Sequence, residues 1–234
     1  MGQWLEYTFG DQSCRLYFDG SMHVKALNTL FISDLHLGKS GQLRKEGIPT
    51  PVTVHKKGMQ RLKEAIKRHP VSNVVFLGDL FDGHQNRETI DLKSLIEKEY
   101  HRTFTLVRGN HDYDLPEWSD LNITEVLEIG NFICVHEPPG SNFKSNKPFR
   151  WAAAKTIFPE ILREKVLLCG HLHPGATLKG KGKFKVKIKA FFFNDWIAVL
   201  PAFGSLTGQH SLGEAGHYFG IFENQIKSLG NWSE

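Results

Sequence analysis

Five short apolar runs, each followed at once by side chains that can bind a metal ion, constrain this sequence more than any other feature. The runs end at Ile32, Leu77, Val107, Val135 and Cys169. Continuous apolar runs of this kind are typical of strands that are buried on both faces. Because open α/β sheets place their functional sites at the carboxyl ends of strands, the polar side chains that follow these runs are predicted to converge.

The first run leads into the segment Phe31 to Lys39, which reads F-I-S-D-L-H-L-G-K. In an extended segment, residues two apart point to the same face, so Asp34 and His36 would aim a carboxylate and an imidazole at one point. Leu35 would then turn back into the core. A carboxylate oxygen with an imidazole nitrogen suits Mn, Fe or Zn better than Ca or Mg.

The other four runs end in the same types of side chain, namely Asp79, Asn110 with His111, His136, and His171 with His173. Taken singly, each has an ordinary structural role: Asp79 is a common helix N-cap and Asn110 a common turn residue. Five consecutive strand ends that all carry Asp, Asn or His are a strong signal of a metal site. His84 and His210 lie outside this pattern and are predicted to be surface histidines.

The remaining pattern predicts an α/β protein that forms a single domain over residues 1–234. Residues 1 to 30 alternate apolar and polar, with turns at Gly10-Asp11 and Asp19-Gly20, as in two or three antiparallel strands. Gly38 to Pro51 reads as a loop. Helices are predicted in three places, in the segment with Met59, Leu62, Ala65 and Ile66, over Arg87 to Tyr100, and around Trp151 to Lys165.

Composition excludes several classes of protein. No apolar run is long enough to span a bilayer, and the N-terminus lacks the pattern of a secretory signal. The three cysteines, Cys14, Cys134 and Cys169, show no paired spacing, which favours buried free thiols and a cytoplasmic location. The net charge of +4 permits nucleic-acid binding without arguing for it.

The combined pattern D-x-H, G-D, G-N-H-D, H and G-H-x-H, which runs from residue 34 to 173, resembles the calcineurin-like metallophosphoesterases. The resemblance implies a two-sheet β-sandwich flanked by helices and a site for two divalent ions. Asp34, His36 and His173 would hold one ion, and Asn110, His136 and His171 the other. Asp79 would bridge the two ions. His111 would be the catalytic histidine that is not a ligand, with Asp112 as the residue that orients its imidazole. The nucleophile would be a hydroxide activated by both metals.

Several segments outside the metal motifs show a narrower resemblance, to the ligase-associated DNA-damage-response endonucleases. These segments are residues 36–51, 135–138, 170–175 and 200–208. The resemblance implies a manganese-dependent phosphodiesterase that acts on DNA in repair, associated with a DNA ligase and a helicase. Lys39 and Arg44, which follow His36, would contact the substrate. The sequence departs from the family at Thr207-Gly208-Gln209 and in a basic stretch from Lys144 to Arg150.

Two other functions compete with this interpretation. A phosphodiesterase for small molecules or a nucleotide pyrophosphatase could carry the same motifs. Mn is the ion expected at the site, with Fe or Zn as alternatives. A scaffold without catalytic activity should have lost some ligands, whereas all seven ligands and His111 are present here. The lysine-rich segment Lys179 to Lys189 also has two interpretations. An edge strand protected by lysines is favoured over a surface that contacts phosphates.

Overall fold

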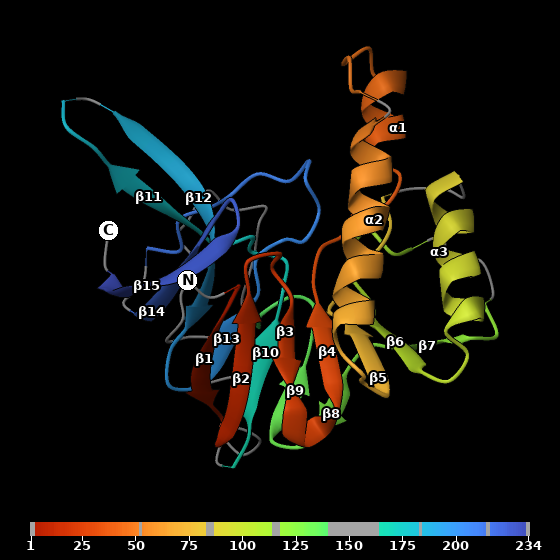
Figure 1. Cartoon of the computed structure of the whole chain (residues 1–234), viewed down its shortest axis with the longest axis horizontal. Helices are drawn as coiled ribbons and strands as arrows, with labels where there is room; N and C mark the ends of the chain where they lie inside the picture. The colour runs from red at the N-terminus through yellow and green to blue at the C-terminus, as the bar shows by residue number, and fades with distance from the viewer. Residues whose placement is uncertain are drawn as a thin grey trace.

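The structure, a computed structural model, describes residues 3–51, 53–82, 87–113, 118–139, 164–182, 184–213 and 216–232. Two β-sheets pack face to face, as predicted (Figure 1). The first sheet has the order β1-β2-β3-β4-β5-β6-β7. Its strands are β1 (Trp4–Phe9), β2 (Gln12–Tyr17), β3 (Met22–Val24), β4 (Thr29–Ile32), β5 (Asn73–Phe76), β6 (Thr103–Val107) and β7 (Leu121–Thr124). β1 to β4 pair antiparallel and β4 to β7 pair parallel, so the N-terminal strands extend a parallel sheet.

The second sheet has the order β15-β14-β12-β13-β10-β9-β8, with β11 paired to β12 outside this path. Its strands are β8 (Leu127–Ile129), β9 (Phe132–Cys134), β10 (Val166–Cys169), β11 (Gly175–Lys179), β12 (Lys185–Phe193), β13 (Ile197–Val199), β14 (Gly216–Phe222) and β15 (Gln225–Trp232). β10 is parallel to both β9 and β13. The carboxyl ends of β9 and β10 therefore lie at one edge of this sheet.

The core between the two sheets holds the apolar side chains that alternate along their inner faces. Phe31 and Val75 from the first sheet pack there against Phe132, Leu168 and Phe193 from the second. The thiols of all three cysteines are buried and free, as predicted. Burying this set of side chains is the main force that holds the sheets together.

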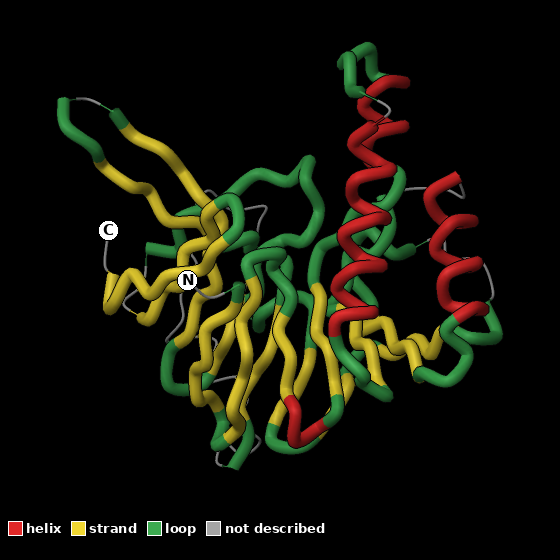
Figure 2. Tube along the Cα trace, viewed as in Figure 1, coloured by secondary structure: helices red, strands yellow, loops and turns green. Residues whose placement is uncertain are grey.

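The outer face of the parallel half of the first sheet is covered by α2 (Thr53–Arg68) and α3 (Arg87–Lys98) (Figure 2). Met59, Leu62 and Ile66 of α2 and Leu92 and Ile96 of α3 form one cluster with β4 to β6. Both helices were predicted from the spacing of these residues. No helix in the described part of the chain is long and apolar enough to cross a membrane.

The predicted loop from Gly38 to Pro51 was wrong in its first half, which forms the helix α1 (Lys39–Lys45). The only large apolar side chain in this helix is Leu43, so no helical periodicity marks it. Glu88 of α3 holds its beginning, accepting hydrogen bonds from the Gly38 amide (2.7 Å) and the Ser40 hydroxyl (2.8 Å). The hydrogen bonds from α1 to Glu88 thus stabilise the start of a helix that the local sequence pattern does not indicate. A single turn of 3₁₀ helix, η1 (Lys25–Leu27), joins β3 to β4. The helix predicted around Trp151 lies outside the described residues.

Candidate dinuclear metal site

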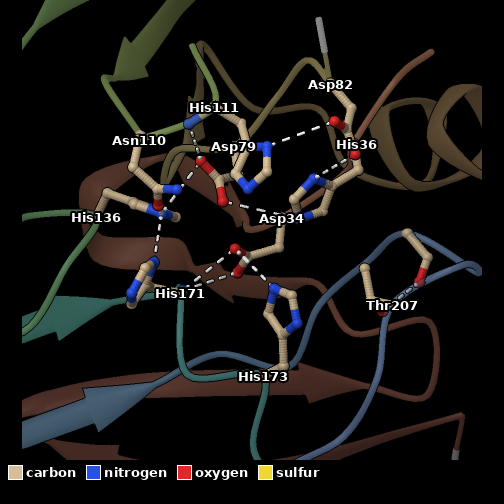
Figure 3. Close-up of polar contacts among 12 residues, drawn as sticks. Asp34, His36, Asp79, Asp82, Asn110, His111, His136, His171, His173 and Thr207 are labelled. Atoms are coloured by element: carbon tan, nitrogen blue, oxygen red, sulfur yellow. Dashed lines mark hydrogen bonds and ion pairs between the residues drawn. The ribbon is translucent and has the colours of Figure 1, made fainter. Parts of the chain in front are cut away.

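The side chains predicted to bind metal lie together where parallel strands of both sheets end (Figure 3). The first sheet contributes the residues just after β4, β5 and β6, and the second sheet those just after β9 and β10. These residues are Asp34, His36, Asp79, Asn110, His136, His171 and His173. His111, predicted to be catalytic and not a ligand, lies beside Asn110. The convergence expected from the rule for open sheets is therefore present, and it draws on two sheets rather than one.

The first donor group contains Asp34, His36 and His173, each of which offers a ligand atom within 4.8 Å of the others. The His173 Nε2 atom lies 3.1 Å from Oδ1 of Asp34. Asp34 is completely buried, and its carboxylate also accepts a hydrogen bond from the backbone amide of His171 (3.1 Å to Oδ2). Burial alone would raise the pKa of Asp34, but the hydrogen bond from His173 and the nearby His136 outweigh it and hold the pKa low.

The second donor group contains Asp79, His136 and His171, again with ligand atoms within 4.8 Å. The His136 Nε2 atom lies 3.3 Å from Oδ1 of Asp79 and 3.1 Å from Nδ1 of His171. Asn110 joins this group through its side-chain oxygen, 3.2 Å from the same His136 nitrogen. The other ring nitrogen of His136 lies 2.8 Å from the carbonyl of Leu77, which orients the ring.

Asp79 lies between the two groups and presents a different oxygen to each. Its Oδ1 faces His136, whereas its Oδ2 lies 3.7 Å from Nε2 of His36. The backbone amide of His111 donates a hydrogen bond to Oδ1 (2.9 Å), which fixes the rotation of the carboxylate. This arrangement places one anion where it can serve two cations.

The chemistry of these donors fits divalent cations. His36 is buried, and neither of its ring nitrogens has a hydrogen-bond partner among the described residues. Burial favours neutral His136, yet its hydrogen bond to Asp79 and the charges of Asp34 and Asp79 raise its pKa to about 9. The buried carboxylates thus hold a proton at His136, and a divalent ion would displace that proton on binding.

A third cluster, formed by His36, Asp82 and His111, overlaps the first group and could also hold a cation by distance alone. Its carboxylate is already neutralised, because Nζ of Lys39 lies 3.4 Å from Oδ2 of Asp82. On the other side of Asp82, Oδ1 lies 3.4 Å from Nδ1 of His111. This hydrogen bond is the main cause of the raised pKa of His111. The cluster therefore favours a protonated imidazole rather than a third metal ion.

The prediction that Asp112 orients His111 was wrong. The Asp112 carboxylate is fully buried and accepts hydrogen bonds from the backbone amides of Phe81 (3.0 Å) and Gly109 (2.9 Å). It therefore fixes two backbone segments beside the site, and burial is the main reason that its pKa is raised to about 6. Asp82 is the residue that contacts the imidazole, although the sequence reasoning did not select it. The second carboxylate of Gly78-Asp79-Leu80-Phe81-Asp82 was the available signal.

The backbone at the site is strained. Among the described residues, seven that are not glycine have positive φ, and five of them are candidate ligands: Asp34, His36, Asp79, His171 and His173. The left-handed region is costly for residues with a Cβ atom, so tertiary contacts must hold these five in place. Such strain clusters at functional sites.

Close approach of the backbone explains why a glycine precedes several candidate ligands. A Cβ atom on Gly109 would lie 2.2 Å from the amide nitrogen of Asp79. On Gly170 it would lie 1.8 Å from Oγ of Ser33 and 2.5 Å from Oδ2 of Asp34. Each of these glycines therefore allows one strand end to pack against a ligand from another strand.

A loop that follows β13 supports the first donor group from behind, a role that sequence reasoning missed. Its backbone amides of Phe203 and Gly204 donate hydrogen bonds to the carbonyls of Ser33 (2.8 Å) and Asp34 (2.9 Å). Two cationic side chains hold the loop, since Lys189 donates to the carbonyls of Ala202 and Gly204, and Arg61 to that of Phe203. Burial lowers the pKa of Lys189 to about 7.

The two residues predicted to bind substrate have different surroundings. Lys39 begins α1 and points into the site through its contact with Asp82, whereas Arg44 is exposed and donates a hydrogen bond to the carbonyl of Thr50 (3.3 Å). His210 is exposed, as predicted, although its backbone amide donates to the carbonyl of His173 (2.9 Å). His84 and the basic stretch from Lys144 to Arg150 lie outside the described residues.

Comparison with known proteins gives a consistent result. The model of the calcineurin-like phosphoesterase family matches residues 27–231. Among solved structures, the crystal structure of the Pseudomonas putida nuclease MPE has a TM-score of 0.73 at 19% identity, covering 97% of this chain and 100% of that one. Vps29 from Entamoeba histolytica complexed with Zn²⁺ has a TM-score of 0.39 at 20% identity, covering 86% and 96%. No curated protein matches the chain significantly.

Proposed function

The chain belongs to the calcineurin-like phosphoesterase family, and from this premise we propose that it hydrolyses phosphodiester bonds in DNA with two bound divalent ions. Membership makes it a metal-dependent phosphoester hydrolase. The observation that carries the two-ion mechanism is the position of Asp79, which presents one carboxylate oxygen to each of two donor groups.

In this proposal, Asp34, His36 and His173 hold one ion, and Asn110, His136 and His171 hold the other, with Asp79 shared. Two bound ions supply positive charge to the phosphoryl oxygens and lower the pKa of a water molecule. The mixed oxygen and nitrogen donors suit manganese, iron or zinc, and we propose manganese.

His111 has the position of a general acid, and its contact with Asp82 favours the protonated imidazole. Its pKa is raised chiefly by its hydrogen bond to Asp82, and its side chain is 39% exposed, so it can reach a bound substrate. His111 would donate its proton to the leaving oxygen, and Asp82 would stabilise the imidazolium until the transfer. Lys39 lies beside this pair, so it would bind a phosphoryl oxygen or a neighbouring phosphate.

Three observations support DNA as the substrate. Lys39, Arg44 and Lys45 give the helix beside the site a positive charge. One solved structure with a similar fold, matched over its full length, is that of a nuclease. The segments at residues 36–51 and 200–208 resemble endonucleases of DNA repair, so we also propose a role in repair beside a DNA ligase and a helicase.

The test is to assay purified protein with Mn²⁺, Zn²⁺ or Fe²⁺ on plasmid DNA, an aryl phosphodiester and a nucleotide pyrophosphate. We expect the protein with Mn²⁺ to nick plasmid DNA and hydrolyse the aryl diester, and a chelator to abolish both activities. Hydrolysis of small substrates without any cleavage of DNA would instead assign a phosphodiesterase or pyrophosphatase for small molecules.

A further inference from the structure

The strands β11 and β12 form a two-stranded ribbon that projects from the body of the protein (Figures 1 and 2). Gly175 to Lys179 pair with Lys185 to Lys189. The pairing of β12 with β14 begins only at Ala190, so no third strand in the described part of the chain pairs with the projecting half. The edges of the projecting half are therefore unpaired within the described residues, and Lys179 and Lys185 to Lys187 are exposed, whereas Ala176 at the base is buried.

The ribbon carries an unbalanced positive charge. Lys179, Lys181, Lys185 and Lys187 are all exposed, and no acidic residue occurs between Gly175 and Lys189. Lys179 lies directly opposite Lys185 in the register. Like charges at opposed positions destabilise a strand pair, by an amount on the order of 0.2–1 kcal/mol. An anionic ligand would remove this repulsion.

Protection of an open strand edge explains these lysines poorly. Lysines that protect an edge discourage pairing by a second chain, and such edges also avoid exposed apolar side chains. On this ribbon, Phe184 is 66% exposed and Val186 is 38% exposed. The lysines are also concentrated on one face, because Lys185 and Lys187 alternate with these apolar residues and Lys179 lies opposite Lys185. A one-sided positive charge is expected of a surface that binds an anion.

The base of the ribbon is tied to the metal site. β11 begins two residues after the candidate ligand His173. The amide of Gly175 donates to the carbonyl of His210 (2.9 Å), and the His210 amide donates to the carbonyl of His173 (2.9 Å). The Nζ atom of Lys187 lies 3.3 Å from the carbonyl of Gln209, in the same segment. A ligand on the ribbon would therefore keep a defined position relative to the site.

We propose that this ribbon is an arm that binds the phosphate backbone of duplex nucleic acid while the metal site acts on a neighbouring phosphodiester. The proposal rests on the proposed function. The major groove of a duplex admits a two-stranded β-ribbon. Single strands are usually held by stacking on several aromatic side chains. The arm has one aromatic residue, Phe184, between Gly175 and Lys189.

The test measures binding of a short DNA duplex, and of one of its strands alone, as a function of salt concentration. The metal-loaded His111→Ala protein is used so that the duplex stays intact, which a gel verifies. In this background, Lys179, Lys181 and Lys185 are replaced together by Gln. The control replaces Lys67, Lys93 and Lys98, three exposed lysines of α2 and α3, and removes the same charge. Thermal unfolding verifies that each variant is folded.

We expect the arm variant to reduce the slope of log K against log salt by up to about 2.7, because each phosphate contact contributes roughly 0.9. The control should keep the slope of the parent protein. An unchanged slope in the arm variant, or a loss of affinity confined to single strands, would overturn the proposal. If the slope is unchanged and the arm variant dimerises, the lysines instead protect the strand edges from pairing. If the parent itself shows no salt-dependent binding of DNA, the proposed substrate fails, which is a different result.

Discussion

His111 and Asp82 show how far reasoning from the sequence reaches for single residues. The candidate ligands are predictable because an apolar run ends just before them and because strand ends converge, which are simple rules. Alternation along an extended strand does not apply to them, since Asp34, His36, His171 and His173 lie beyond the strand ends with positive φ. Neither rule selects Asp82, because it follows Asp79 by three residues in a segment without regular structure. Asp112 was misassigned because its neighbour in the sequence, His111, is not the partner of its carboxylate. Asp82 and His111 are 29 residues apart in the sequence, so their contact can be identified only in the folded chain.

The role of His111 as a proton donor predicts a difference between substrates. His111→Ala should lower kcat on DNA by roughly 10²- to 10⁴-fold, the usual contribution of a positioned acid. The loss should be much smaller on an aryl diester, because a phenolate leaves without needing a proton. Steady-state kinetics on both substrates provide the measurement, and metal analysis should find the metal content unchanged.

Asp82→Asn serves as the companion variant, because it keeps the shape of the side chain but removes the charge that raises the pKa of His111. Like His111→Ala, it should lower kcat on DNA. Equal losses on both substrates in His111→Ala, or the loss of one metal equivalent, would show that His111 acts on the metal or its water rather than on the leaving group.

At the scale of elements, the structure explains the glycines that precede the candidate ligands. Gly170 directly follows β10 and packs against Ser33 and Asp34, which directly follow β4. The sequence predicts the strands themselves from their apolar runs, but it does not show that strands of different sheets come this close. For the same reason, α1 was missed: the contacts of Glu88 that hold it come from another element.

Gly170→Ala should therefore disturb the site as well as the fold. The added Cβ atom would meet the Ser33 hydroxyl and the Asp34 carboxylate, and overpacking of this kind costs about 1–3 kcal/mol. We expect a lower Tm, by roughly 2–4 °C for each kcal/mol, together with weaker metal binding.

Gly58→Ala in α2 is the matched control, because a Cβ atom there meets nothing within 4 Å. Alanine in a helix should raise the stability by roughly 0.5–1 kcal/mol and leave metal binding unchanged. A Gly170→Ala protein with the metal affinity of the unmodified chain would mean that the β10 end does not set the position of Asp34.

At the scale of the whole molecule, the site exists only when both sheets are packed together. The first sheet supplies Asp34 and Asp79, and the second supplies His136 and His171, which lie on strands far away in the sequence. Each donor group combines residues from both sheets, so the apolar residues between the sheets also assemble both groups. Period-two patterns indicate which residues face inward, but the pairing of the two sheets came from the resemblance to a known family.

Asp79 joins two donor groups into one site for two metal ions, and metal analysis after dialysis is the decisive measurement. The unmodified protein should retain two equivalents, and His111→Ala should retain the same number. Asp79→Asn should lose affinity at both positions, because the anion shared by them is gone, and should retain less than one equivalent. An Asp79→Asn protein that keeps two equivalents and normal turnover, or an unmodified protein that binds only one ion when saturated, would contradict the account.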